Sequence, residues 1–72
     1  MSSEEFLAQI YCRNSGIDIF PLHSGEGAYT IIIEDRRDMS LTFSPKTYQK
    51  LEAELKVHEL EIYYYRKSVV SN

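Results

Sequence analysis

The chain has 72 residues, of which 43% are hydrophobic and 26% are charged, and its formal net charge is −3. This length allows one small domain, 1–72, and this composition is typical of an ordered chain, which excludes disorder. The negative charge disfavours broad affinity for nucleic acids or acidic membranes, and no apolar run is long enough to cross a membrane.

A helix is expected over residues 3–14. Ser2 and Glu5 have the spacing of a capping box, and the acidic start suits the positive end of a helix but not a cleavable signal peptide. Gly16 follows as a left-handed stop. The apolar side chains recur at helical spacing in a narrow stripe, which favours packing on a sheet: Phe6, Leu7, Ile10 and Tyr11.

Two strands are expected next. Ile17, Ile19 and Pro21 predict a short edge strand, because proline cannot donate a hydrogen bond to the ladder. Residues 29–34 are rich in β-branched side chains and predict a strand that is buried on parts of both faces. The intervening residues 23–27 have the composition of a turn.

A third strand is expected after the charged turn 35–38. Met39, Leu41 and Phe43 alternate with Ser40 and Thr42, which predicts a half-buried strand. We expect Leu41 and Phe43 to lie in the core with Ile31 or Ile33, and the two hydroxyl side chains to face solvent. The three strands then form an antiparallel meander.

A second helix is predicted to begin with Ser44 as its N-cap and Pro45 as its first residue. Tyr48, Leu51 and Leu55 would form one apolar stripe on this helix, and that stripe would pack on the sheet.

The segment 57–66 leaves two interpretations open. Alternation of Leu60, Ile62 and Tyr64 with polar or aromatic neighbours slightly favours a fourth strand. No glycine or proline interrupts the chain, however, so the second helix could continue. In that case Ile62 would share the first stripe, and a second stripe would face a partner: Ala53, Val57, Leu60 and Tyr64. The predicted fold class is α+β under either interpretation.

The tyrosine-rich segment is the best candidate for a binding surface, because tyrosine and arginine are enriched where proteins meet. We expect partner binding by residues of this segment and of the charged turn: Leu60, Tyr63, Tyr64, Tyr65, Arg66, Arg36 and Arg37. The leading hypothesis is a non-enzymatic adaptor, regulator or inhibitor that binds an unidentified larger protein. The alternative is a nucleic-acid-binding module, in which tyrosines stack on bases and Arg66, Lys67, Arg36 and Arg37 contact phosphate.

Catalytic groups are few. Cys12 would need one of the two histidines, His23 or His58, within hydrogen-bond reach, and its place near a helix C-terminus disfavours a thiolate. His23 and Glu26 supply only two ligands, so no metal or other cofactor is expected, and residues 25–27 form a turn, not a phosphate loop. We therefore expect a protein that is not an enzyme.

Self-association is also expected. A chain this small is marginally stable by itself, and a single cysteine excludes an intramolecular disulfide. We expect a twofold homodimer with the segment 57–66 in or beside the interface. The lone cysteine also indicates a reducing compartment, so a cytoplasmic location is expected.

Overall fold

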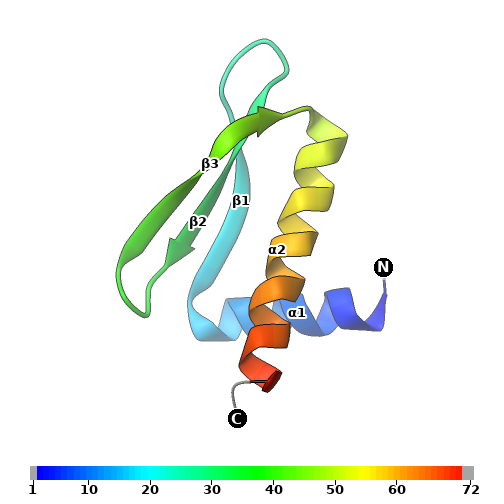
Figure 1. The fold of residues 1–72 in the computed structure, drawn as a ribbon, viewed down its shortest axis with the longest axis vertical. Coiled ribbons are helices and arrows are strands. Elements are labelled where there is room, and N and C mark those ends of the chain that lie inside the picture. The colour runs from blue at the N-terminus through cyan, green and yellow to red at the C-terminus, as the bar shows by residue number, and fades with distance from the viewer. Residues whose placement is uncertain (1, 71–72) are drawn as a thin grey trace.

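The computed structural model describes residues 2–70, and Figure 1 shows how these residues form two helices and three strands. The chain runs through helix α1 (Ser3–Ser15), strands β1 (Ile17–His23), β2 (Tyr29–Asp35) and β3 (Ser40–Tyr48), and helix α2 (Lys50–Val70). The strands form one antiparallel sheet in the order β1-β2-β3. The predicted α+β fold with a β-meander is confirmed.

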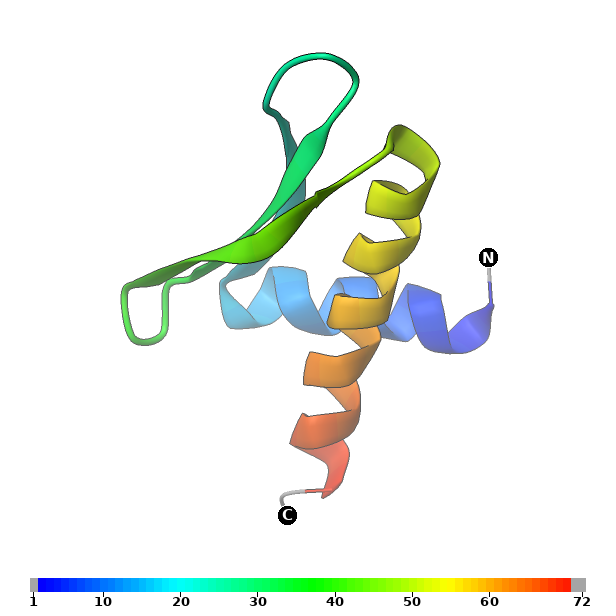
Figure 2. The ribbon, with the colours of Figure 1, turned by 45° about the horizontal axis from the view of Figure 1, so that its top comes forward.

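Both helices lie on the same side of the sheet, where they cross each other (Figures 1 and 2). α2 packs on β1 and β2, and α1 packs on α2 and on β1. The core lies between these two layers and consists mainly of small or β-branched side chains: Ala8, Cys12, Ile17, Ile31 and Ala53. β3 is therefore the strand that the helices cover least.

The ends of α1 follow the sequence signals. The Ser2 hydroxyl accepts a hydrogen bond from the backbone N–H of Glu5 at 3.2 Å, which satisfies one of the free donors of the first turn. Gly16 ends the helix with φ of 79°, in the left-handed region that favours glycine. Its carbonyl then accepts from the N–H of Arg36 at 2.9 Å, which connects the start of β1 to the β2–β3 turn.

Strand register divides the sheet into a helix-facing side and an open side. Ile31 lies on the helix-facing side, opposite Pro21 of β1, and is 1% exposed. Its neighbour Ile32 points the other way, because side chains alternate along a strand. Ile32 lies between Phe20 of β1 and Phe43 of β3, which are directly opposite it in the register.

The predicted burial of Leu41 and Phe43 is wrong. Phe43 pairs with Ile32 and Leu41 pairs with Glu34, so both side chains lie on the open side and are more than half exposed. Ser40 and Thr42 are exposed as predicted, although they lie on the helix-facing side. The alternation identified a strand correctly, but neither helix reaches over this edge strand, so alternation did not reveal which face is buried.

The predicted start of the second helix is also wrong. Ser44 and Pro45 lie within β3, next to an irregularity in its pairing with β2 between Thr30 and Ile32. The Ser44 hydroxyl accepts from the N–H of Ile31 at 3.0 Å and donates to the carbonyl of Lys46 at 2.7 Å. A proline is tolerated here because β3 is an edge strand.

Of the two interpretations of the segment 57–66, the helical one is confirmed and the strand does not form. The ion pair of Lys56 with Glu59 at 3.1 Å, at i, i+3 spacing, supports the continuous helix, and Nδ1 of His58 lies 3.3 Å from a carboxylate oxygen of Glu61. Local pairs of this kind and the absence of a helix breaker outweigh the β propensity of the tyrosines.

The two apolar stripes of α2 have the opposite roles to those predicted. Ala53 is 1% exposed and belongs to the stripe that packs on the molecule's own core, together with the partly buried Val57, Leu60 and Tyr64. Leu51 and Leu55 are 74% and 69% exposed. Tyr48, expected on the same stripe, belongs to β3. Small Ala53 allows the close approach that a bulky leucine would prevent.

Candidate functional site

The structure distributes the predicted binding residues over three places. Tyr63 and Arg66 lie on the outer surface of α2, Arg37 lies near Tyr64 between the sheet and the helices, and Arg36 lies on the open side of the sheet. Leu60 and Tyr65 are only partly exposed. The predicted residues therefore do not form one continuous site.

A groove of about 710 Å³ runs along the outer surface of α2. We call it the α2 groove. Glu5 of α1 lines part of it, and the lining residues from α2 include Leu55, Glu59, Ile62, Tyr63, Arg66 and Val70. Tyr63 is 56% exposed, and its ring packs edge-on against that of Tyr64 at 5.5 Å between centroids. The ammonium group of Lys67 lies 5.9 Å from the centre of the Tyr63 ring, which holds the ring beside the helix.

Arg66 connects the two helices. Its Nε and Nη2 atoms donate to the two carboxylate oxygens of Glu4 in α1, at 2.7 and 2.6 Å. This hydrogen bonding lowers the pKa of Glu4 below its ordinary value. The bidentate geometry fixes the orientation of the guanidinium group beside the α2 groove.

Arg37 lies at the junction between the β2–β3 turn and both helices, beside Asp35, Tyr11 and Tyr64. Its guanidinium donates to Asp35 at 2.9 and 2.7 Å, and to the hydroxyl of Tyr11 at 3.4 Å. Asp35 was expected in the charged turn 35–38, but it ends β2 and is only 7% exposed. Hydrogen bonds from Arg37 lower the pKa of Asp35, so this carboxylate is charged at neutral pH.

Tyr64 lies close to this junction. It lines a small cleft with Tyr11 and Arg37. Burial raises the pKa of its hydroxyl, and the nearby charge of Asp35 acts in the same direction. Tyr64 therefore belongs to the packing between α2 and the rest of the molecule, as Tyr65 does through its contact with Tyr11 at 6.2 Å between ring centroids.

Arg36 points to the other side of the sheet from Arg37. It forms ion pairs with Asp18 of β1 and with Glu34 of β2, the latter at 3.2 Å. Arg36, Arg37 and Arg66 thus each bind a carboxylate of their own chain. These ion pairs offset the positive charge that the nucleic-acid alternative would direct at phosphate.

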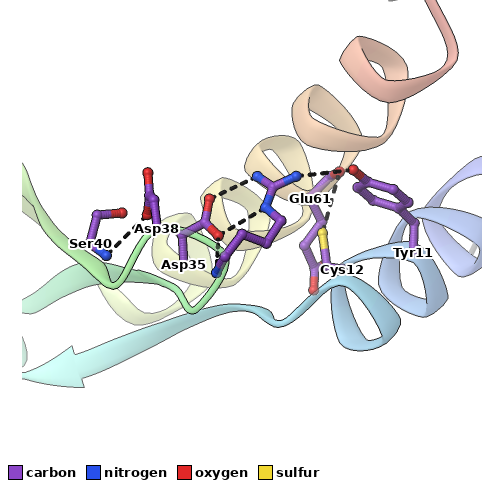
Figure 3. Close-up of polar contacts among 7 residues, drawn as sticks. Tyr11, Cys12, Asp35, Asp38, Ser40 and Glu61 are labelled. Atoms are coloured by element: carbon purple, nitrogen blue, oxygen red, sulfur yellow. Dashed lines mark hydrogen bonds and ion pairs between the residues drawn. The ribbon is translucent and has the colours of Figure 1, made fainter. Parts of the chain in front are cut away.

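Cys12 is the buried thiol of α1, with 2% of its surface exposed. Its Sγ lies 3.8 Å from the carbonyl oxygen of Glu61 (Figure 3). Burial, and secondarily the charge of Glu61, raises the pKa of the thiol to about 11. The thiol is therefore protonated at neutral pH, a state that does not suit a nucleophile.

Both histidines have local structural contacts. The Nδ1 atom of His58 lies 3.4 Å from Nε2 of Gln9 and 3.3 Å from a carboxylate oxygen of Glu61. His23 packs on Tyr29 across the β1–β2 pair, at 5.0 Å between ring centroids. Glu26 lies in the exposed β1–β2 turn with φ of 50°. Within residues 2–70, no group of three histidine, cysteine or acidic side chains has the arrangement of a metal site.

The open side of the sheet carries apolar residues that the sequence interpretation missed or assigned to the core. We call this surface the open face, defined by Phe20, Leu22, Ile32, Leu41 and Phe43. Four of its members are between 39% and 56% exposed, and only the central Ile32 is buried. The sequence signal for this open face was the presence of apolar residues at consecutive positions in β1 and β2. Consecutive residues point to opposite faces, and two helices can cover only one face of this sheet.

Comparison of the chain with protein-family models, with curated proteins and with solved structures finds no match. Neither of the helices within residues 2–70 is both long and apolar enough to cross a membrane.

Proposed function

We propose that this protein is a non-enzymatic interaction module and that its binding surface is the open face of the sheet. The observation that carries the proposal is the row formed by Phe20, Ile32 and Phe43 across the three strands. Leu22 and Leu41 extend the apolar surface on either side of this row. The partner is an apolar surface of a larger protein, which the open face binds by removing both surfaces from water.

The exposure of these side chains supports the proposal. Phe43 is 56% exposed and Leu41 55%, although both are side chains that proteins usually bury. Contiguous exposed apolar surface on a small domain is typical of an interaction site. Aromatic residues contribute much of the energy at such sites, so Phe20 and Phe43 are the expected anchors.

The polar surroundings give the open face an orientation. At one end of the sheet, Arg36 bridges Asp18 and Glu34 on the same side as the apolar row. These three side chains are each about half exposed, so they can form the polar rim that surrounds the apolar centre of many interfaces.

The proposal is tested with three matched proteins: the wild type, Phe43→Ser and Phe6→Ser. Phe6 of α1 is also 56% exposed, so its substitution removes an equally exposed ring from a different surface. Each protein is immobilised and exposed to lysate of the source cell, and the captured proteins are compared by mass spectrometry. Binding of the dye ANS to the purified proteins reports exposed apolar surface independently of any partner.

The expected result is that Phe43→Ser loses both the captured partner and most of the ANS binding, whereas Phe6→Ser retains both. Circular dichroism confirms that each variant remains folded. A partner that still binds Phe43→Ser with wild-type affinity would refute the open face as the binding surface. Loss of binding in Phe6→Ser alone would place the interaction on α1.

We further propose that the protein works in the cytoplasm and forms a homodimer. The single thiol of Cys12 supports a reducing compartment. The exposed apolar side chains of α2, among them Leu51 and Leu55, support a second interface on the side of the molecule away from the open face. A homodimer through α2 would leave two open faces available to partners.

A further inference from the structure

We infer that the α2 groove binds the same groove of a second copy of this chain, with the two α2 helices antiparallel and the twofold axis passing between Ile62 and Tyr63. This inference rests on the proposed homodimer and is independent of partner binding by the open face. It assigns an occupant to the groove of about 710 Å³ on the outer surface of α2.

The spacing of the lining residues matches an antiparallel pairing. Leu55 lies seven residues before Ile62, and Val70 lies seven residues after Tyr63. A twofold axis between Ile62 and Tyr63 therefore places Leu55 of one copy opposite Val70 of the other, at both ends of the interface. Leu55 and Val70 are 69% and 82% exposed, so each would gain cover from the pairing.

The charged residues of the groove also match this pairing. Glu59 lies three residues before Ile62, and Arg66 lies three residues after Tyr63. The same axis therefore places the carboxylate of Glu59 opposite the guanidinium of Arg66 in the other copy, twice per dimer. In a parallel pair, Glu59 would instead face Glu59 of the other copy and Arg66 would face Arg66, and both contacts between like charges are unfavourable. Glu59 and Arg66 are thus complementary across the axis only in the antiparallel orientation.

The existing contacts of these two residues allow the pairing. Glu59 is bound to Lys56 on the same helix, and its side chain is 69% exposed. Arg66 uses Nε and Nη2 for Glu4, and a guanidinium has five N–H donors. The bond to Glu4 leaves donors for a second carboxylate and holds the guanidinium group in place beside the groove.

Cysteine cross-linking tests the register in a Cys12→Ala background. Leu55→Cys and Val70→Cys are prepared as separate proteins and oxidised alone and as a mixture. In the proposed register, the Leu55 positions of the two copies are offset by about 22 Å along the helix axis, at roughly 1.5 Å per residue. A disulfide cannot bridge this distance. The mixture, by contrast, brings the two different cysteines together.

The expected result is a disulfide-linked dimer in the mixture and little or none with either protein alone. Tyr63→Cys, next to the axis, is expected to cross-link with itself. Rapid cross-linking of Leu55→Cys alone would indicate parallel helices and overturn the inference. Sedimentation equilibrium of the wild type separates the test of the homodimer from the test of its register. A monomer at 100 µM would refute the homodimer itself. A dimer whose variants form no mixed disulfide would refute only this register.

Charge reversal supplies a second test that leaves the apolar residues unchanged. Glu59→Arg and Arg66→Glu are each expected to weaken homodimerisation roughly tenfold, because two symmetry-related attractions become repulsions. A mixture of the two variants is expected to form a heterodimer, since each contact across the axis then joins opposite charges. Equal amounts of homodimer and heterodimer in the mixture would contradict the pairing of Glu59 with Arg66.

Discussion

The clearest thermodynamic prediction compares Ile31 and Phe43, which lie on opposite sides of the sheet. Ile31 is 1% exposed between the sheet and the helices, so Ile31→Ala removes fully buried methyl groups and is expected to cost about 2–5 kcal/mol. Phe43 keeps less than half of its surface buried, so Phe43→Ala is expected to cost about 1 kcal/mol despite the larger ring. The smaller residue is therefore the more important one for stability.

Urea unfolding followed by circular dichroism measures both effects. A domain of this length has a total stability of roughly 4–11 kcal/mol and a denaturant slope near about 1 kcal/mol per molar urea. The midpoint is then expected to fall by about 2 M or more for Ile31→Ala and by about 1 M for Phe43→Ala. If Ile31→Ala does not fold, Ile31→Val is expected to cost about 1 kcal/mol. A greater loss for Phe43→Ala than for Ile31→Ala, at every protein concentration, would refute the assignment of the two faces.

Three further predictions concern polar groups. Cys12 is expected to react with iodoacetamide far more slowly in the folded protein than in urea at pH 7, because the thiol is buried and its pKa is raised to about 11; equal labelling rates by mass spectrometry would contradict this. Arg37→Ala is expected to lower the melting temperature more than Arg36→Ala, since it leaves the carboxylate of Asp35 buried without its cation. The lowered pKa of Asp35 stabilises the fold at pH values above the ordinary pKa of 3.8, so wild-type stability should fall as the pH drops below about 4. The lowered pKa of Glu4 acts in the same direction, so Arg37→Ala should lose only the part of this dependence that comes from Asp35. Burial raises the pKa of Glu61, so its charge opposes folding as the pH rises above 4.5; Glu61→Gln is expected to be at least as stable as the wild type at pH 7, and a large loss would contradict this.

Most of the fold could be predicted because its signals are local. Ser2 and Gly16 mark the ends of α1 through hydrogen bonding and backbone conformation, which depend on neighbouring residues. The alternation from Met39 to Phe43 identified β3 for the same reason. The end of β3 was missed because a serine followed by a proline is typical of a helix start. In this strand the Ser44 hydroxyl also accepts a hydrogen bond from a backbone N–H, as an N-cap serine would.

The assignment of faces was not predictable from these signals. Phe43 and Ile31 have equally strong apolar patterns, and only the position of the helices decides which is buried. The helices in turn pack where small residues allow close approach, which Ala53 and Ala8 do. The carboxylate partners of the arginines could not be predicted either. Arg36 and Arg37 are adjacent in sequence, but they bind carboxylates on opposite sides of the sheet.

Solvent exposure of the open face is the claim on which the proposed function most directly depends. NMR with a soluble gadolinium chelate measures it, because the chelate attenuates signals of side chains that solvent can reach. We expect strong attenuation for Phe20, Leu41 and Phe43 and protection for Ile31 and Ala53. Protection of Phe43 together with attenuation of Ile31 would show that the helices cover the other side of the sheet and would contradict the account.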